Sequence, residues 1–340
     1  MTPQLNILFN AFTLILASTL RMSTPLTLTA LGGMFSERTG VVNVGLEGIM
    51  LMGAFSAMAG SYLTGQPWLG FLLGTIVGGV FALIHAVASI HLRGNQVVSG
   101  MALNVLAMAL TGFLLRRLFQ HAGHSPQVAS LPEWNFLPVF GLCDGVPILR
   151  NVLGSESIVA QVIGRGTPPI YLCLILVVAS HYVLFHTPLG MRLRAVGEHP
   201  EAAESLGISV YGLRYLGVIL SGLLGGMGGA TLSVGLLNSF GENMTTGRGF
   251  IALAAMNFGK WRPYGALRAC LIFGFFVAFE MQAQSLASLS VFFPWLKVFS
   301  LIPREVFLGL PYVATILILA GFIGRSTPPA ASGLPYEGRK

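Results

Sequence analysis

The sequence predicts an all-α, polytopic membrane helix bundle of about ten transmembrane segments, and its composition and apolar blocks support this. Of the 340 residues, 54% are hydrophobic and only 9% are charged, whereas soluble domains carry about 25% charged residues. The mean hydropathy is +0.76. A soluble fold of this length has too little interior to bury so much apolar surface. Repeated apolar blocks also approach or exceed the ~20 residues that cross a bilayer.

Glycine, proline and charged residues separate the apolar blocks and set the expected segment ends. Two of the blocks, 24–36 and 246–258, are too short to cross alone, because a helix of that length reaches about 20 Å of a ~30 Å hydrocarbon core. Short or broken helices are typical of transport pathways. The expected segments are 5–22, 24–36, 42–63, 69–92, 96–119, 168–188, 209–238, 246–258, 263–285 and 304–324.

The charge pattern and the cysteines exclude several classes of protein. The net charge is +7, but the nineteen Lys and Arg stand singly at the ends of apolar blocks, as membrane anchors do. We therefore expect contact with membrane lipid and no nucleic-acid partner. The three cysteines have no CxxC spacing, so no metal site is expected. The start, MTPQLN, lacks the basic region of a cleaved signal peptide, and the first block is expected to be a retained helix.

Motifs for catalysis are missing from the sequence. It contains no GxxxxGK[ST], GxSxG or HExxH pattern, so we expect no catalytic residue and no P-loop for ATP phosphates on this chain. An ion-coupled carrier would need ionisable groups within the membrane. The candidates for that alternative are Glu47, Arg268 and Glu280.

The stretch FSERTGVVNVGLEGIM, residues 35–50, places an amide and a carboxylate inside an apolar run. Asn43 and Glu47 are four residues apart, so a continuous helix would project both from one face. Glu47 could cap a neighbouring helix or pair with a loop arginine such as Arg38. It could alternatively contact substrate. We favour hydrogen bonds that hold a broken corner together, with Gly40 relieving the tight turn SERTG.

One permease domain, 1–340, is expected, with an extracytoplasmic loop at 120–167, a cytoplasmic loop at 188–208 and a cytoplasmic tail at 326–340. The bias of Lys and Arg among the short loops places 188–208 and both termini in the cytoplasm. Within that loop, Pro200 suits the first position of a helix, and Gly207 suits its stop. The sequence therefore predicts a short helix of about seven residues, which could dock a soluble partner or simply connect two spans.

Three stretches carry a resemblance to a known family. The pattern E201-A202-A203-x-x-x-G207 resembles the EAA loop of ABC-transporter permeases, the membrane subunits of ATP-driven importers. ALGGMFSERTGVVNVGLEGIMLMGAF and GRGFIALAAMNFGKWRPYGALRACLIFGFF resemble the sugar, nucleoside and branched-chain amino-acid branch, and most of all its nucleoside (simple sugar) permeases. The resemblance runs from about residue 20 to 325, although 286–302 is bulkier and more aromatic than the family pattern.

The resemblance implies a path for nucleosides or related simple sugars that works by alternating access in a bacterial inner membrane. It implies no cofactor on this chain, because ATP and Mg bind a partner ATPase subunit. The other implied partners are a second homologous permease and an extracytoplasmic substrate-binding lipoprotein. A ribose or branched-chain amino-acid permease, or an ion-coupled carrier, is the alternative. The implied ATPase-coupling residues are Arg192, Arg194, Glu198, Glu201, Ala202, Ala203 and Gly207.

Polar residues within or beside the apolar blocks are candidates for the substrate pathway. Their amides could bind ribose hydroxyls or base edges, or could instead form hydrogen bonds between helices. No constellation of charged residues selects one substrate, so the transported molecule stays open. The pathway candidates are Asn43, Glu47, Asn104, Asn243 and Asn257.

Overall fold

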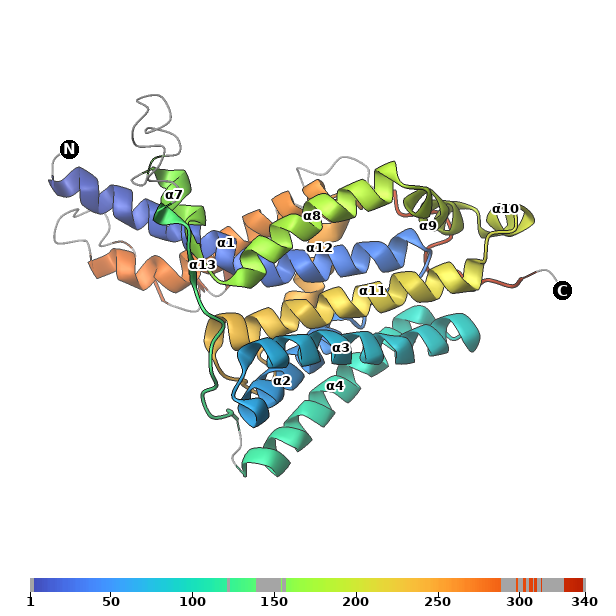
Figure 1. Cartoon of the computed structure of the whole chain (residues 1–340), viewed down its shortest axis with the longest axis horizontal. Coiled ribbons are helices and arrows are strands. Elements are labelled where there is room, and N and C mark those ends of the chain that lie inside the picture. The colour runs from blue at the N-terminus through green and yellow to red at the C-terminus, as the bar shows by residue number, and fades with distance from the viewer. Residues whose placement is uncertain are drawn as a thin grey trace. The chain divides into compact units, whose positions relative to one another are not determined.

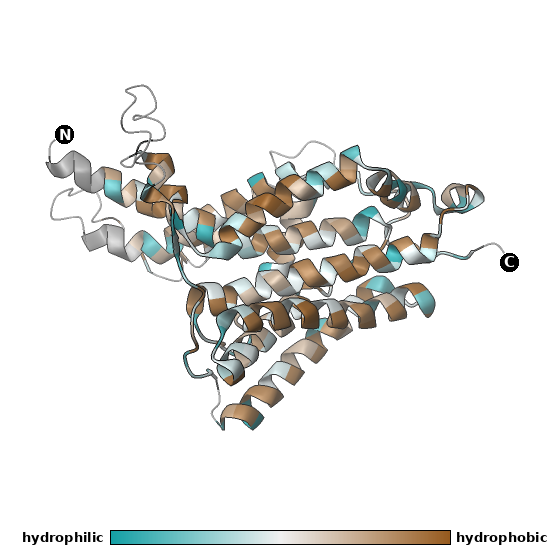
Figure 2. Cartoon of the chain, viewed as in Figure 1, coloured by the Kyte–Doolittle hydropathy of each residue, from teal (hydrophilic) through white to brown (hydrophobic). Residues whose placement is uncertain are grey.

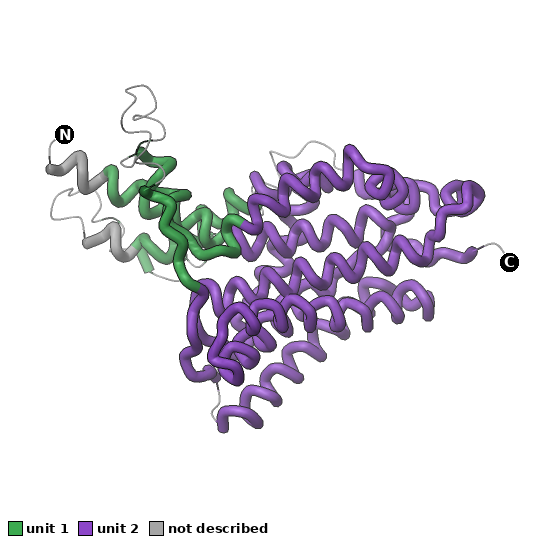
Figure 3. Tube along the Cα trace, viewed as in Figure 1, with its two compact units in different colours: residues 1–23, 132–171, 270–324 green, residues 24–131, 172–269, 325–340 purple. Residues whose placement is uncertain are grey.

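The computed structural model describes residues 3–120, 123–138, 154, 157–288 and 327–338, with isolated positions between 298 and 313 (Figure 1). Helices dominate these residues, which confirms the predicted all-α class. The sheet in the described part is a pair of two-residue antiparallel strands, β1 (Trp134–Asn135) and β2 (Arg165–Gly166). The chain divides into two compact units, residues 1–23, 132–171 and 270–324 in unit 1 and the rest in unit 2 (Figure 3).

Seven of the described helices are long and apolar enough to cross a membrane. The expected segment 304–324 lies largely outside the described residues. The helices are α1 (Pro3–Arg38), α2 (Leu46–Thr64), α3 (Pro67–Ala86), π-helical η1 (Val87–His91), α4 (Gln96–Phe119), α7 (Ile158–Ile163), α8 (Pro168–His186), α9 (Pro188–Glu198), α10 (Pro200–Ser205), α11 (Val210–Ala230), π-helical η3 (Thr231–Leu237), α12 (Arg248–Phe258) and α13 (Pro263–Ser288).

The expected separation of 5–22 from 24–36 is wrong. Helix α1 runs without a break through Pro25 from Pro3 to Arg38. Proline is tolerated inside membrane helices, where neighbouring groups compensate for the missing N–H. The turns after Pro25 are closely packed, and the side chains of Leu26, Leu28 and Leu31 are all buried. The second short segment is confirmed, because α12 has eleven residues.

The core of unit 2 is built where α11 packs against α2 and α3. Glycines allow the backbones to meet, since a Cβ on Gly53 of α2 or on Gly78 of α3 would lie 2.5 Å from the Cα of Gly226. On α11, which carries Gly226, a Cβ on Gly229 would overlap the carbonyl oxygen of Met50. Small residues at helix interfaces are typical of membrane proteins, where van der Waals packing drives association.

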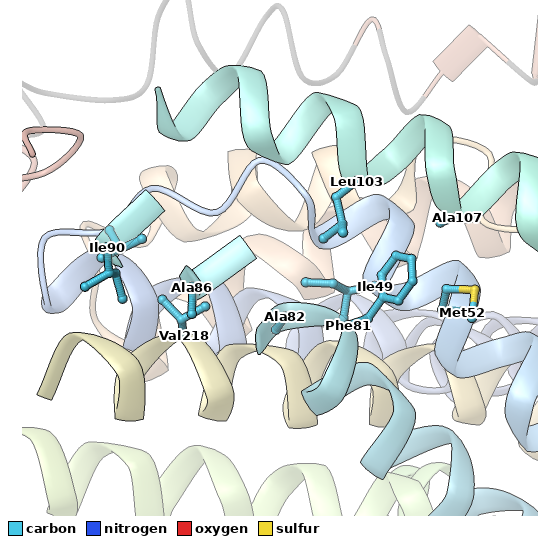
Figure 4. Close-up of a cluster of buried hydrophobic side chains, with 10 residues drawn as sticks. Ile49, Met52, Phe81, Ala82, Ala86, Ile90, Leu103, Ala107 and Val218 are labelled. Atoms are coloured by element: carbon cyan, nitrogen blue, oxygen red, sulfur yellow. The ribbon is translucent and has the colours of Figure 1, made fainter. Parts of the chain in front are cut away.

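Apolar side chains of unit 2 form a buried cluster beside these glycines and an exposed face on α4. Apolar residues run the length of α3 and α4 (Figure 2), and Val98, Val105 and Phe113 of α4 are each more than 60% exposed. A face of that kind suits lipid. The cluster in Figure 4 joins α2, α3, η1, α4 and α11 and contains Val41, Ile49, Met52, Phe81, Ala82, Ala86, Ile90, Leu103, Ala107 and Val218.

Candidate functional site

Residues 35–48, which we call the corner, connect α1 to α2. Helix α1 ends at Arg38, and the backbone N–H of Gly40 donates to the carbonyl of Glu37 at 2.9 Å. Gly40 has φ +87°, in the left-handed region that glycine adopts without strain. The side chain of Ser36 closes the turn by donating to the carbonyl of Val41 at 2.6 Å. Gly40 therefore makes the tight turn that the sequence predicted.

The face shared by Asn43 and Glu47 is not observed. Residues 41–43 are not helical and α2 begins at Leu46, so the two residues do not lie on one continuous helix. The turn at Gly40, with φ +87°, interrupts the helix before Asn43. Asn43 instead donates from Nδ2 to the Oγ of Ser221 on α11 at 3.0 Å, and its side chain is fully buried.

Glu47 caps helix α12. Its Oε1 accepts from the backbone N–H of Gly247 at 2.8 Å, and its Oε2 accepts from that of Gly249 at 2.6 Å. The N-cap residue of α12, Gly247, has φ +84° and no side chain of its own to satisfy these donors. A carboxylate at this end also complements the positive end of the helix dipole. This is the capping alternative for Glu47, and Arg38 does not take part in it.

Gly249 allows the carboxylate to reach the end of α12. A Cβ at this position would lie 2.5 Å from the Cα of Glu47, so a larger residue would push the helix away from α2. The two long stretches of the family resemblance thus hydrogen bond to each other, because Glu47 belongs to the first and Gly249 to the second. Sequence reasoning did not predict that pairing.

Asn104 of α4 holds the start of α2 in a similar way. Its Oδ1 accepts from the backbone N–H of Gly48 at 2.8 Å, and its Nδ2 donates to the carbonyl of Val44 at 3.0 Å. Both polar ends of the amide are therefore used in joining α4 to the corner. Asn104 thus joins two helices by a hydrogen bond, and Asn43 joins the corner to α11.

The remaining pathway candidates lie near the two ends of α12. Asn243 is exposed in the turn before α12 and has φ +56°, whereas Asn257 is exposed near the end of that helix. The eleven residues of α12, at 1.5 Å of rise each, separate Asn243 from Asn257. The structure brings Asn43, Glu47 and Asn104 together at the corner, whereas Asn243 and Asn257 stand near opposite ends of α12.

Polar residues from other parts of the chain also bond to the corner, and the sequence did not predict these contacts. The Nε1 of Trp261 donates to the carboxylate of Glu37 at 2.7 Å, and the guanidinium of Arg38 donates to the carbonyl of Trp261 at 2.9 Å. His85 of α3 is fully buried, and its two ring nitrogens lie 3.0 Å from the Oγ of Ser99 and from the carbonyl of Val42. The charged turn GKWRP, residues 259–263, can be recognised in the sequence. Its contacts with Glu37 and Arg38 cannot be predicted from the sequence.

Loop 188–208 contains the predicted short helix. Pro200 stands at the start of α10, and Gly207 follows its end with φ +76°. The N–H of Gly207 donates to the carbonyl of Glu204 at 2.8 Å, and that of Ile208 to the carbonyl of Ala203 at 3.1 Å. Glycine in the left-handed conformation is a common helix stop. The predicted boundaries are therefore confirmed.

The predicted coupling residues differ in exposure. Glu201, Ala202 and Arg192 are exposed, whereas Ala203 is buried in a cluster with Val196. Glu198 accepts at Oε2 from the backbone N–H of Ala330 at 3.2 Å. Arg194 lies with its guanidinium carbon 5.1 Å from the ring centre of Phe185. One face of α10 thus points outward while the other is covered.

Among the described residues, no three side chains of histidine, cysteine, aspartate or glutamate gather as metal ligands. The polar groups of the corner instead form cross-links between helices. Such a site can hold the angle between α1, α2 and α12.

Comparison with known proteins finds relatives whose sequences align with almost the whole chain. Residues 15–319 match the family model described as the branched-chain amino acid transport system / permease component. The chain is 43% identical to the guanosine ABC transporter permease protein NupQ of Bacillus subtilis, over 95% of this chain and 96% of that protein. It is 41% identical to the nucleoside ABC transporter permease protein NupC of Lactococcus lactis, over 96% and 98%.

A further relative, the putative glucose ABC transporter permease protein TsgC13 of Haloferax volcanii, is 34% identical over 90% of each chain. No solved structure matches. With seven apolar helices of spanning length and a family match over most of its residues, this is a multi-pass membrane protein. The chain belongs to the family of ABC-transporter permease components described for branched-chain amino acid transport systems.

Proposed function

We propose that the chain is the permease subunit of an ATP-driven importer of nucleosides. The observation that carries this is the 43% and 41% identity, over nearly full length, to two permeases named for guanosine and nucleoside transport. The permease named for glucose is more distant, at 34% identity. Nucleosides therefore take precedence over simple sugars, ribose and branched-chain amino acids.

In this proposal the chain forms the translocation path and alternates access, while a separate ATPase subunit binds ATP and Mg. A second homologous permease and an extracytoplasmic binding protein complete the importer, and this chain needs no cofactor. The loop 188–208 and both termini lie in the cytoplasm. The exposed face of α10, with Glu201 and Ala202, meets the ATPase subunit, and Gly207 ends the helix there.

The corner supports a positioning role for three of the pathway candidates. Both carboxylate oxygens of Glu47 accept from α12, and Asn104 holds α2. The exposed Asn243 and Asn257 stay as candidates for contact with substrate. An ion-coupled carrier that used Glu47 would have to break the cap of α12 in each cycle, which argues against that alternative.

Uptake by the reconstituted importer tests the proposal. The permease is assembled with its second permease and ATPase in proteoliposomes, the binding protein is added, and labelled guanosine, glucose, ribose and leucine are compared. We expect guanosine uptake only with ATP, and little uptake of the other three. Uptake that continues without the ATPase but requires a proton or sodium gradient would exclude an ATP-driven importer. ATP-dependent uptake of leucine or ribose instead of guanosine would refute the proposed substrate alone.

A further inference from the structure

The C-terminal segment, residues 327–338, lies against α9 and the corner in unit 2 (Figure 1). The backbone N–H of Ala331 donates to the carbonyl of Gly197, at the end of α9, at 2.9 Å. Two residues further on, the N–H of Gly333 donates to the carbonyl of Gly40 at 3.2 Å. The segment is therefore attached by its backbone to the two places where the chain reverses direction.

Helix α11 anchors the same segment through a buried arginine. Arg214 is 1% exposed, and its Nη1 donates to the carbonyl of Leu334 at 3.1 Å. Its guanidinium carbon also lies 5.5 Å from the ring centre of Tyr336, within the range of a cation–π contact. Tyr211 adds an edge-on ring contact with Tyr336 at 5.5 Å between ring centres.

Tyr336 connects the segment to α10. Its side chain is buried in a cluster with Val196, Ala203 and Val210, so the covered face of α10 rests on the tyrosine ring. Burial, with a contribution from the nearby Glu204 carboxylate, raises the pKa of Tyr336 to about 12, and the phenol is neutral at physiological pH. Removing this ring would take one of its packing partners from Ala203.

A cavity of about 630 Å³ opens between α10 and the C-terminal segment. Its accessible charge is acidic, because the exposed Glu198 and Glu201 line it, together with Glu337, which is paired with Arg93 at 3.2 Å. The one lining arginine, Arg214, is buried; its Nη1 donates to Leu334, and its Nε and Nη2 have no hydrogen-bond partner among the described residues. The lining also includes two prolines and Tyr336. The residues that give it this character are Glu198, Pro200, Glu201, Pro335, Tyr336 and Glu337.

We propose that α10 and the C-terminal segment form one docking surface for the ATPase subunit, and that this cavity receives an arginine or lysine side chain of that subunit. The proposal rests on the proposed function. An acidic cavity complements a cationic side chain, and such complementarity selects the partner and its orientation. A guanidinium also pairs with carboxylates through two parallel hydrogen bonds. The cavity is continuous with the exposed face of α10, through Glu201 and Ala202.

Binding of the cognate ATPase subunit to the assembled permease pair in nanodiscs tests the surface. Tyr336→Ala, which removes the wall of the cavity, should weaken binding about tenfold, equivalent to about 1.4 kcal/mol. Tyr336→Phe keeps the ring and should bind within about twofold of the wild type. Glu337→Lys should weaken binding by roughly threefold to tenfold through charge reversal.

Glu242→Lys is the matched control for Glu337→Lys. Both glutamates are in exposed ion pairs, Glu242 with Arg116 at 3.4 Å and Glu337 with Arg93 at 3.2 Å, and such pairs contribute little to stability. ATPase binding that is equally weak in both variants, or unchanged in Glu337→Lys and Tyr336→Ala, would overturn the docking surface. A wild-type permease pair that binds no ATPase would instead refute the proposed function.

Photo-crosslinking gives a second readout that does not depend on a destabilising change. Leu334 borders the cavity and is 57% exposed, so a photoreactive amino acid at this position should capture the ATPase subunit. The same amino acid in place of Trp134, which is 41% exposed on the loop expected outside the cell, should not. Capture from Trp134 but not from Leu334 would contradict the proposal.

Discussion

The corner and the loop 188–208 both depend on polar side chains but use them in opposite ways. At the corner, Glu47 and Asn104 satisfy backbone groups of neighbouring helices, and both oxygens of the carboxylate are occupied. On α10, Glu201 is exposed and lies at the rim of a cavity. Polar residues inside this bundle hold helices together, whereas those on α10 remain available to a partner. Changes at the corner should therefore affect stability, and changes on α10 should affect coupling.

Removing the carboxylate at the corner should have the largest effect on stability. Glu47→Ala leaves the N–H groups of Gly247 and Gly249 without an acceptor, and each unsatisfied buried donor costs about 1–3 kcal/mol. We expect a total loss of about 2–6 kcal/mol, seen as a lower midpoint of thermal aggregation in detergent. Glu47→Gln retains one acceptor oxygen and should lose about half as much. Equal stability of Glu47→Ala and the wild type would show that the cap contributes nothing.

Widening the contact between α2 and α12 should have the next largest effect. Gly249→Ala introduces a Cβ that would lie 2.5 Å from the Cα of Glu47, and overpacking of this kind costs about 1–3 kcal/mol. Gly207→Ala is a control at a glycine with no neighbour within 4 Å of its added Cβ. Gly207 has φ +76°, so local backbone strain should lower the stability of Gly207→Ala by only about 1–2 kcal/mol. Gly249→Ala adds a steric overlap that Gly207→Ala lacks. The same thermal assay should therefore show the greater loss of stability for Gly249→Ala.

Asn104→Ala should destabilise the corner by a smaller amount. The substitution removes one acceptor from Gly48 and one donor from Val44, and hydrogen bonds between membrane helices average about 0.6 kcal/mol with a maximum near 1.7 kcal/mol. We therefore expect a loss of about 1–2 kcal/mol in the same assay. A loss as great as that of Glu47→Ala would mean that the charge of Glu47 adds nothing to its hydrogen bonds.

Glu201→Lys should have the smallest effect on stability, within about 0.5 kcal/mol, because the side chain is exposed on α10. Transport should nevertheless be abolished and ATPase binding weakened, as measured by uptake and by pull-down of the ATPase subunit. Glu201→Lys should therefore lose transport while it stays folded. In Glu47→Ala, by contrast, any loss of transport follows the loss of folded protein. Unchanged pull-down by Glu201→Lys would remove α10 from the docking surface.

The sequence predicted much of the helix order, because apolar length and turn residues are local signals. It also located α10, since Pro200 and Gly207 mark a start and a stop that depend on backbone geometry alone. It failed at Pro25, where packing around α1 overrides the local preference of proline. It also could not identify the partner of Glu47, because Gly247 is 200 residues away in the sequence. Spacing along one helix says nothing about which distant helix end will need an acceptor.

That long separation affects the order of events during biosynthesis. Helix α2 is made and inserted about 200 residues before the N-terminus of α12 is available to the Glu47 carboxylate. A charged residue at the centre of a membrane helix raises the free energy of insertion by about 2.5–3.5 kcal/mol, but Glu47 stands in the first turn of α2, at the end of the helix. Until α12 has emerged from the ribosome, the Glu47 carboxylate cannot accept from the N–H groups of Gly247 and Gly249, so the corner closes only after that point.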